Sequence, residues 1–277
     1  MRLKIYREYG ALNSKDVFDA FSAGVIRLGH KIVETNEDIA VIWSVLWQGR
    51  MLQNQLVYQD CQNRNIPVMI IEVGNLKRGI TWRLSLDHIN GQGKFANIND
   101  LDLLRPQKLA VELKPLLTTR RHEILIASQH KFSLQWHGMP TMEQWIEKTV
   151  KRIRKYSNRN IVVRPHPRSP IRLSPIDGVK IEIPNKISNS YDDFDIDYNF
   201  HCVINHNSGP AVQAAIAGTP VICDASSLAG PMSEKWENLD NPMLPPREEW
   251  FLKLCHTEWT LQELAQGIPQ ARLIATI

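Results

Sequence analysis

Short apolar runs alternate with amphipathic stretches along most of the chain, which is the pattern of a parallel α/β protein. The run at 67–72 is rich in Val, Met and Ile, as expected for a parallel strand covered on both faces. Residues 74–100 are rich in Gly and Asn, so we expect loops with only short elements there. The expected strands of the first half are 3–6, 31–33, 39–43 and 67–72, and the expected helices are 15–28 and 50–64.

The alternation restarts after an irregular, proline-containing stretch at residues 101–117. The expected strands are 124–127, 160–163, 180–183, 201–205 and 220–223, and the expected helices are 142–156, 210–217, 248–255 and 260–266. We therefore predict an α/β protein with two Rossmann-like domains facing across a cleft. The predicted domains are residues 1–118 and residues 119–277, and the last helix can pack back on the first domain.

Residues 201–228 combine a strand, a polar turn, a short apolar helix and a second strand. Ser208 can cap the helix with its side-chain oxygen, Pro210 suits the first helical turn, and Gly218 can end the helix. Free backbone N–H groups at such a helix start, with the helix dipole behind them, can bind a phosphate. The alternative is a well-capped core helix without a ligand.

Composition sets limits on the class of protein. The 277 residues have a formal net charge of +4, and no apolar run approaches the roughly 18 residues of a membrane span. The first residues are too short and too polar a run for a signal peptide, so we expect a cytoplasmic protein. Basic residues concentrate at 148–172, which favours either a polyanionic partner or a solvated helix face.

Several common motifs are missing from the sequence. It has no G-x-x-x-x-G-K-[ST] phosphate loop, no G-x-G-x-x-G after the first strand and no G-x-S-x-G elbow. These absences argue against a P-loop kinase, a nicotinamide-dependent dehydrogenase and a serine hydrolase. Asp195 and Asp197 have the spacing of a metal-binding pair, but their acidic turn is better interpreted as a solvated loop.

Three sequence blocks carry a resemblance to a known family. They are ILIASQ at 124–129, VVRPHP at 162–167 and NSGPAVQAAIAGTPV at 207–221. Together they resemble the donor domain of GT-B-fold glycosyltransferases, particularly the bacterial capsule-polysaccharide and glycerophosphate-transferase-like branches. The resemblance implies a nucleotide-diphosphate sugar as donor, with a UDP-sugar expected first, and no metal or further cofactor.

The resemblance also assigns roles to residues. Arg164 is expected to neutralise the leaving diphosphate, and His166 to contact phosphate or nucleotide. Gln213 stands where many relatives use Glu to hold the ribose. The residues expected to bind the donor are Ser128, Gln129, Arg164, His166, Asn207, Ser208, Gly209 and Gln213.

An inverting transfer needs a general base near the attacking hydroxyl, whereas a retaining one might need none. Glu8, Glu72, Asp87 and His88 are the candidates in the first half. Glu72 is the first choice, because it ends an apolar strand, and Asp87 is the second. With Arg164, these two carboxylates form the predicted catalytic set.

For the acceptor, our first expectation is double-stranded DNA with a 5-hydroxymethyl-pyrimidine base, as in phage DNA glycosyltransferases. It depends on the basic segment and on Trp43, Trp47, Trp82 and Trp136 being exposed enough to fill the space of a flipped base. Trp47, Trp82 and His88 are the expected acceptor contacts. The alternatives are a surface glycan or polyol phosphate, a non-catalytic nucleotide- or nucleic-acid-binding module, and a hydrolase or epimerase of the same donors. The sequence does not specify the donor sugar or the oligomeric state.

Overall fold

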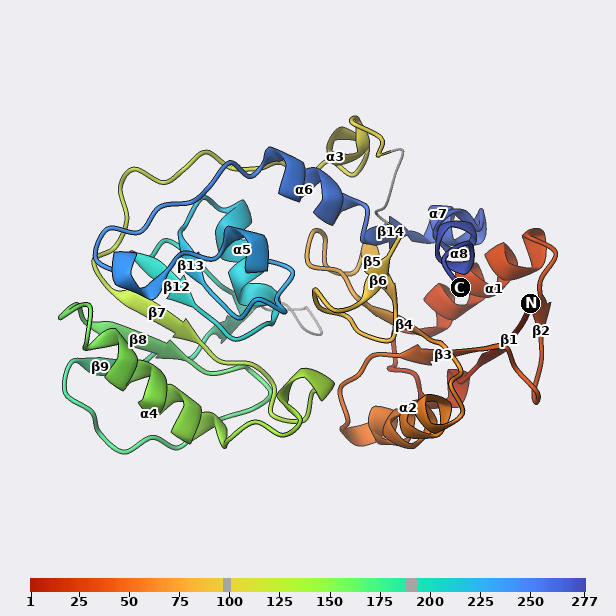
Figure 1. The fold of residues 1–277 in the computed structure, drawn as a ribbon, viewed down its shortest axis with the longest axis horizontal. Helices are drawn as coiled ribbons and strands as arrows, with labels where there is room; N and C mark the ends of the chain where they lie inside the picture. Colours follow the sequence, from red (N-terminus) through yellow and green to blue (C-terminus); the bar gives the residue numbers. More distant parts are fainter. Residues whose placement is uncertain (97–100, 188–193) are drawn as a thin grey trace. The chain divides into compact units, whose positions relative to one another are not determined.

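The computed structural model describes residues 1–96, 101–187 and 194–277, and the chain forms two compact units. The first unit contains Met1–Val111, Phe132–Leu134 and Trp250–Ile277. The second contains Glu112–Lys131 and Gln135–Glu249. The first unit therefore includes residues 250–277, which contain the final helix of the chain (Figure 1).

The first unit is built on a mixed sheet with the strand order β14-β5-β4-β3-β1-β2, in which β6 also pairs with β5. Strands β1 to β4 are parallel, as predicted, whereas β5, β6 and β14 are antiparallel to their neighbours. β5 lies in the stretch predicted to be mostly loop, so that part of the prediction was wrong. The bounds are β1 Arg2–Ile5, β2 Lys31–Ile32, β3 Ile39–Trp43, β4 Val68–Val73, β5 Thr81–Leu86, β6 Lys94–Phe95 and β14 Glu258–Thr260.

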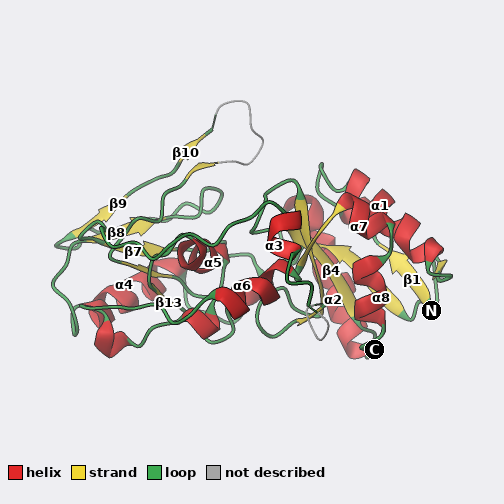
Figure 2. Ribbon diagram, turned by 90° about the horizontal axis from the view of Figure 1, so that it is seen from above, coloured by secondary structure: helices red, strands yellow, loops and turns green. Residues whose placement is uncertain are grey.

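Helices cover both faces of this sheet because successive strand residues point to opposite sides. On one face, Trp43, Ile71 and Trp82 pack with side chains of α1 and of the C-terminal α7 and α8, which lie beside α1 in Figure 1 and Figure 2. On the other face, Ile42 and Ile70 pack against α2. The bounds are α1 Lys15–Arg27, α2 Gln53–Asn63, α3 Arg105–Lys108, α7 Leu261–Ala265 and α8 Ile268–Ile274.

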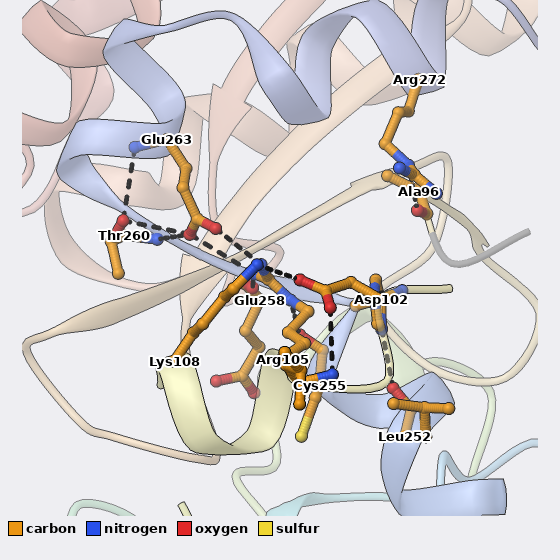
Figure 3. A network of polar contacts seen from close by, with 12 residues as sticks. Ala96, Asp102, Arg105, Lys108, Leu252, Cys255, Glu258, Thr260, Glu263 and Arg272 are labelled. Atoms are coloured by element: carbon orange, nitrogen blue, oxygen red, sulfur yellow. Dashed lines mark hydrogen bonds and ion pairs between the residues drawn. The ribbon is translucent and has the colours of Figure 1, made fainter. Parts of the chain in front are cut away.

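A buried arginine holds the C-terminal segment in the first unit (Figure 3). Arg105 is 4% exposed and makes an ion pair of 2.6 Å with Glu263. Its guanidinium also donates to the backbone carbonyls of Cys255 and Glu258. Because one side chain binds the end of α6, the start of β14 and the first turns of α7, the last elements of the chain are part of this unit's core.

The second unit is built on a parallel sheet with the strand order β13-β12-β7-β8-β9. α4 begins with the predicted capping box of Thr141 and Gln144, and Gly218 ends α5 in the left-handed conformation at φ 87°. Two short strands, β10 Asn185–Lys186 and β11 Phe194–Asp195, form a separate antiparallel pair. The other bounds are β7 Ile124–Ala127, α4 Met142–Ile153, β8 Ile161–Arg164, β9 Val179–Ile181, β12 Cys202–Ile204, α5 Gly209–Ile216, β13 Val221–Ile222 and α6 Glu248–Cys255.

Short 3-10 helices connect these elements at Arg7–Tyr9, Gly49–Leu52, Leu134–Trp136, Gly230–Met232 and Trp236–Asn238. Among the described residues, no helix has the length and apolar character that crossing a membrane requires.

Candidate functional site

The strand order of the second unit reverses direction at β7. β8 and β9 follow on one side of it, while β12 and β13 lie on the other. In parallel sheets, ligands bind at the carboxyl ends of the strands where such a reversal occurs. Here those ends are followed by Ser128 and Gln129 after β7 and by residues 205–208 after β12.

The side chain of Asn205 connects the ends of β7 and β12 through hydrogen bonds. Its Nδ2 atom donates to the carbonyl of Ala127 at 2.8 Å and to Oγ of Ser208 at 3.0 Å, and its Oδ1 atom accepts from the backbone N–H of Ser208. Ser208 has the extended backbone of an N-cap residue, but its side chain makes no capping hydrogen bond. The prediction that its oxygen caps α5 was therefore wrong, because Asn205 occupies that oxygen.

The start of α5 has backbone donors that are not used within the described part of the chain. The N–H groups of Gly209 and Ala211 have no acceptor there, and Pro210 has no N–H. Residues 206–210 are half-buried, so this turn is partly open to solvent. These amides and the helix dipole create a positive potential at the switch point.

A second group of polar residues lines the same edge. The Gln129 side-chain oxygen accepts from the N–H of Asn207 at 3.3 Å, and Ser128 Oγ accepts from the N–H of His166 at 2.9 Å. Nδ1 of His166 accepts from the N–H of Arg168, so in the neutral ring the proton is on Nε2. The structure thus brings together Ser128, Gln129, Asn207, Ser208 and Gly209, with His166 bonded to Ser128.

His130 follows Gln129 and contacts His166 edge to face, with 5.1 Å between ring centroids. Burial lowers the pKa of His130 to about 4, and the positive charge of Arg168 adds to the effect. The ring is therefore neutral at physiological pH.

Arg164 does not take the place predicted for it. It is 6% exposed, and its guanidinium makes an ion pair of 2.7 Å with Glu182 and donates to the carbonyl of Asp197. The guanidinium also lies 5.3 Å from the ring centroid of Phe200. These contacts occupy its guanidinium, so the expectation that it neutralises a leaving diphosphate finds no support in this geometry.

The loop after β13 adds polar groups that the predicted site did not include. Asn207 Nδ2 donates to Ser226 Oγ at 3.0 Å, and Ser226 donates to Asp224. The hydrogen bonds from Ser226 hold the pKa of Asp224 below its usual value. In the sequence, the signal for Asp224 and Ser226 is that they are polar residues directly after the expected strand 220–223. Gln213 lies on α5 and is half-buried.

The first unit carries the predicted base Glu72, at the carboxyl end of β4. Its Oε2 atom accepts from Ser44 Oγ at 2.6 Å, and its Oε1 atom accepts from the N–H of Val73. Ser44 follows β3, the strand next to β4, and has a φ of 61°. No sequence motif indicates Ser44, because its position next to Glu72 depends on strand pairing.

Asp87 lies at the other end of β4. Its carboxylate accepts from the N–H of Val68, the first residue of that strand, and its backbone carbonyl accepts from Tyr58. His88 follows it directly. The structure therefore separates Asp87 and His88 from Glu72 by about 13 Å, which is the strand rise from Val68 to Glu72.

The tryptophans expected to contact an acceptor are core residues. Trp43, Trp47, Trp82 and Trp136 are between 2% and 8% exposed. Trp82 packs on Trp43 at 5.6 Å between centroids, and Trp47 packs on Tyr58. The expectation that these rings are exposed was wrong, because each ring belongs to a hydrophobic core cluster of its unit.

No protein-family model and no curated protein matches the chain. Among solved structures, the chain is similar to Thermosulfurimonas dismutans KpsC, beta Kdo 2,7 transferase, with a TM-score of 0.51 and 13% identity over 98% of this chain and 99% of that one. The beta Kdo 2,4 transferase of the same KpsC has a TM-score of 0.46 and 12% identity over 92% of this chain and 90% of its own. The first likeness shows that the chain has a glycosyltransferase fold.

Proposed function

We propose that this protein is a glycosyltransferase that moves a sugar from a nucleotide-sugar donor to a hydroxyl group. The observation that carries the proposal is the start of α5, where the N–H groups of Gly209 and Ala211 have no acceptor in the described chain. They stand at the switch point of a parallel sheet, where phosphate groups bind in this class of fold. The fold shared with a Kdo transferase supports the same reaction class.

In this proposal the donor's phosphate binds the amides of Gly209 and Ala211. His166, whose backbone N–H binds Ser128 beside this turn, adds positive charge when its ring is protonated. Arg164 has no direct part, because Glu182 and Asp197 already occupy its guanidinium. We therefore assign the positive potential to the helix start and His166, and we keep the expectation from the sequence resemblance that no divalent metal takes part.

The chemical step breaks the bond between the sugar's anomeric carbon and the phosphate oxygen, which leaves with the bonding electrons. The acceptor oxygen forms the new bond to that carbon, and its proton passes to Glu72 as general base. Glu72 suits this role because its carboxylate is half-buried and, in the described chain, receives hydrogen bonds from Ser44 and Val73 alone.

For the acceptor we propose a glycan hydroxyl. A DNA acceptor loses its main support, because Trp47 and Trp82 cannot fill the space of a flipped base without opening the core. Part of the basic segment is also occupied within the unit: Arg152 stacks on Trp236, and Arg154 donates to the carbonyl of Arg159. Binding of duplex DNA with an affinity that falls steeply as the salt concentration rises would reverse this choice.

The test compares two variants at one position of α5. Pro is favoured at the first helical position and removes the N–H of residue 209, whereas Ala keeps it. We expect Gly209→Pro to weaken donor binding about 10-fold or more, as for loss of a charge-assisted hydrogen bond, and Gly209→Ala to bind like the wild type. Binding is measured by calorimetry with UDP-, GDP- and CMP-sugars, including CMP-Kdo, and turnover by sugar transfer to glycan acceptors. Equal binding by both variants, or no donor bound by the wild type, would overturn the proposal.

A further inference from the structure

We propose that Ser44 is a positioning residue that orients the Glu72 carboxylate for proton transfer. This inference rests on the proposed function, in which Glu72 is the general base. It adds a residue that comes from a different strand and from a part of the sequence without any motif.

The pairing of β3 with β4 brings the two residues together. Trp43 is the register partner of Ile71, so Ser44 and Glu72 are the next residues on two neighbouring parallel strands. Ser44 is 3% exposed, and its Oγ lies 2.6 Å from Oε2 of Glu72. A buried hydroxyl at this distance holds the carboxylate in one orientation.

A second hydrogen bond fixes the direction of the Ser44 hydroxyl. Ser44 Oγ accepts a hydrogen bond from the backbone N–H of Leu46 at 3.2 Å. A serine hydroxyl has one proton, and with this N–H on one lone pair its proton is directed to Glu72. The contact between Ser44 and Glu72 therefore has a defined donor and a defined acceptor.

The backbone of Ser44 is also unusual. Its φ of 61° lies in the left-handed region, which is unfavourable for a non-glycine residue. Glycine would adopt this conformation without the cost, but it has no hydroxyl. Strained backbone of this kind concentrates at functional sites, where a side chain has to point in one direction.

A second glutamate on the same sheet provides a structural contrast. Arg83 is the register partner of both Glu72 on β4 and Glu258 on β14, and it forms no ion pair with either. Glu258 is fully buried and accepts from two backbone N–H groups and from Thr81 Oγ1. Glu72 is half-buried, and Ser44 is its one side-chain partner in the described part of the chain. The Glu258 carboxylate therefore has a structural role, whereas the oxygens of the Glu72 carboxylate can still accept the proton of a substrate hydroxyl.

The hydrogen bond from Ser44 prevents rotation of the Glu72 carboxylate away from the acceptor, so that its lone pair is presented in one direction. Loss of the hydroxyl should therefore lower kcat. The KM for the donor should not change, because donor binding is assigned to other residues.

The experiment uses Ser44→Gly, which removes both the hydroxyl and the backbone strain. We expect its Tm to equal or exceed that of the wild type, while kcat falls about 10- to 100-fold, in the range of general base catalysis. Ser85→Ala is the matched control, since Ser85 is a fully buried serine of the same unit, without a hydrogen-bond partner in the described chain. It should keep both the wild-type kcat and the wild-type KM for the donor.

A double-mutant cycle with Glu72→Gln separates positioning from a general structural effect. If Ser44 acts through Glu72, adding Ser44→Gly to Glu72→Gln causes no further loss of kcat. Independent losses that multiply, or an unchanged kcat in Ser44→Gly, would overturn this inference alone. Absence of sugar transfer by the wild type in the same assay would overturn the proposed function as well.

Discussion

The guanidinium of Arg105 lies over the indole of Trp259, with its central carbon 4.0 Å from the ring centroid. Trp259 is a core residue of β14, and Arg105 also pairs with Glu263, which caps α7 (Figure 3). One side chain thus combines a cation–π contact, an ion pair and two backbone hydrogen bonds. The C-terminal segment is fastened to the first unit at this point.

Substitution Arg105→Ala should therefore destabilise the first unit by about 3–5 kcal/mol, because it leaves buried acceptors and the Glu263 carboxylate without their partner. Urea denaturation followed by circular dichroism measures the effect. Lys108→Ala is the matched control, since Lys108 forms its ion pair with Asp102 at the surface and should change stability by less than about 1 kcal/mol. Equal stability of the two variants would contradict the role assigned to Arg105.

Arg164→Gln should separate stability from donor binding. The variant loses the ion pair with Glu182 and the hydrogen bond to Asp197. We expect a loss of about 2 kcal/mol, because Glu182 remains partly solvated. The donor Kd measured by calorimetry should stay within about twofold of the wild type. A folded Arg164→Gln protein without donor affinity would restore the role that the sequence resemblance implied.

The sequence predicted those elements whose cause is local. The Val- and Ile-rich runs became β3, β4, β7, β8 and β12, and the capping box of α4 formed between residues three positions apart. β5 was missed although Trp82, Leu84 and Leu86 alternate with polar residues, because the glycines around it suggested a loop. A period of two was the better signal.

The errors at the candidate site have a different origin. Arg164 pairs with Glu182, which is 18 positions away, and the Asn205 side chain occupies the oxygen of Ser208. Ser44 meets Glu72 across a strand pair. Which partner a polar side chain binds depends on tertiary packing, so the sequence motifs indicated a candidate site at the strand ends but could not predict these hydrogen bonds.

Acidification should destabilise the protein before most carboxylates titrate. Burial lowers the pKa of His130 to about 4, and it also lowers the pKa values of His201, His206 and His256. In the unfolded chain these rings titrate near 6.5, so the unfolded state binds more protons below that pH. Stability is therefore complete above about pH 6.5 and falls as the pH decreases toward 4.

His130→Gln tests the largest of these shifts. A decrease from 6.5 to about 4 corresponds to about 3 kcal/mol of stability lost by pH 4, so the variant should show a smaller decrease between these pH values. Urea midpoints at several pH values give the slope. His137→Gln, at an exposed histidine, is the control and should keep the wild-type slope. An unchanged slope in His130→Gln would contradict the proposed cause.

Gly24 marks a close approach of α1 to the C-terminal helices. A Cβ atom at this position would overlap the carbonyl oxygen of Leu264 and the amide nitrogen of Gln270. The Gln270 side chain is fully buried and donates to the carbonyls of both Phe21 and Leu264. Neither neighbour can therefore move away without breaking these hydrogen bonds.

Gly24→Ala should consequently destabilise the first unit, although alanine improves the intrinsic stability of a helix by about 1 kcal/mol. We expect a net loss of about 1–3 kcal/mol, because overpacking a fixed backbone contact exceeds the gain in propensity. Thermal and urea denaturation provide the measurement. Ala23→Gly on the exposed face of α1 is the control, and it should lose about 1 kcal/mol through propensity alone. A stabilised Gly24→Ala protein would mean that α1 and the C-terminal helices pack less closely than the structure indicates.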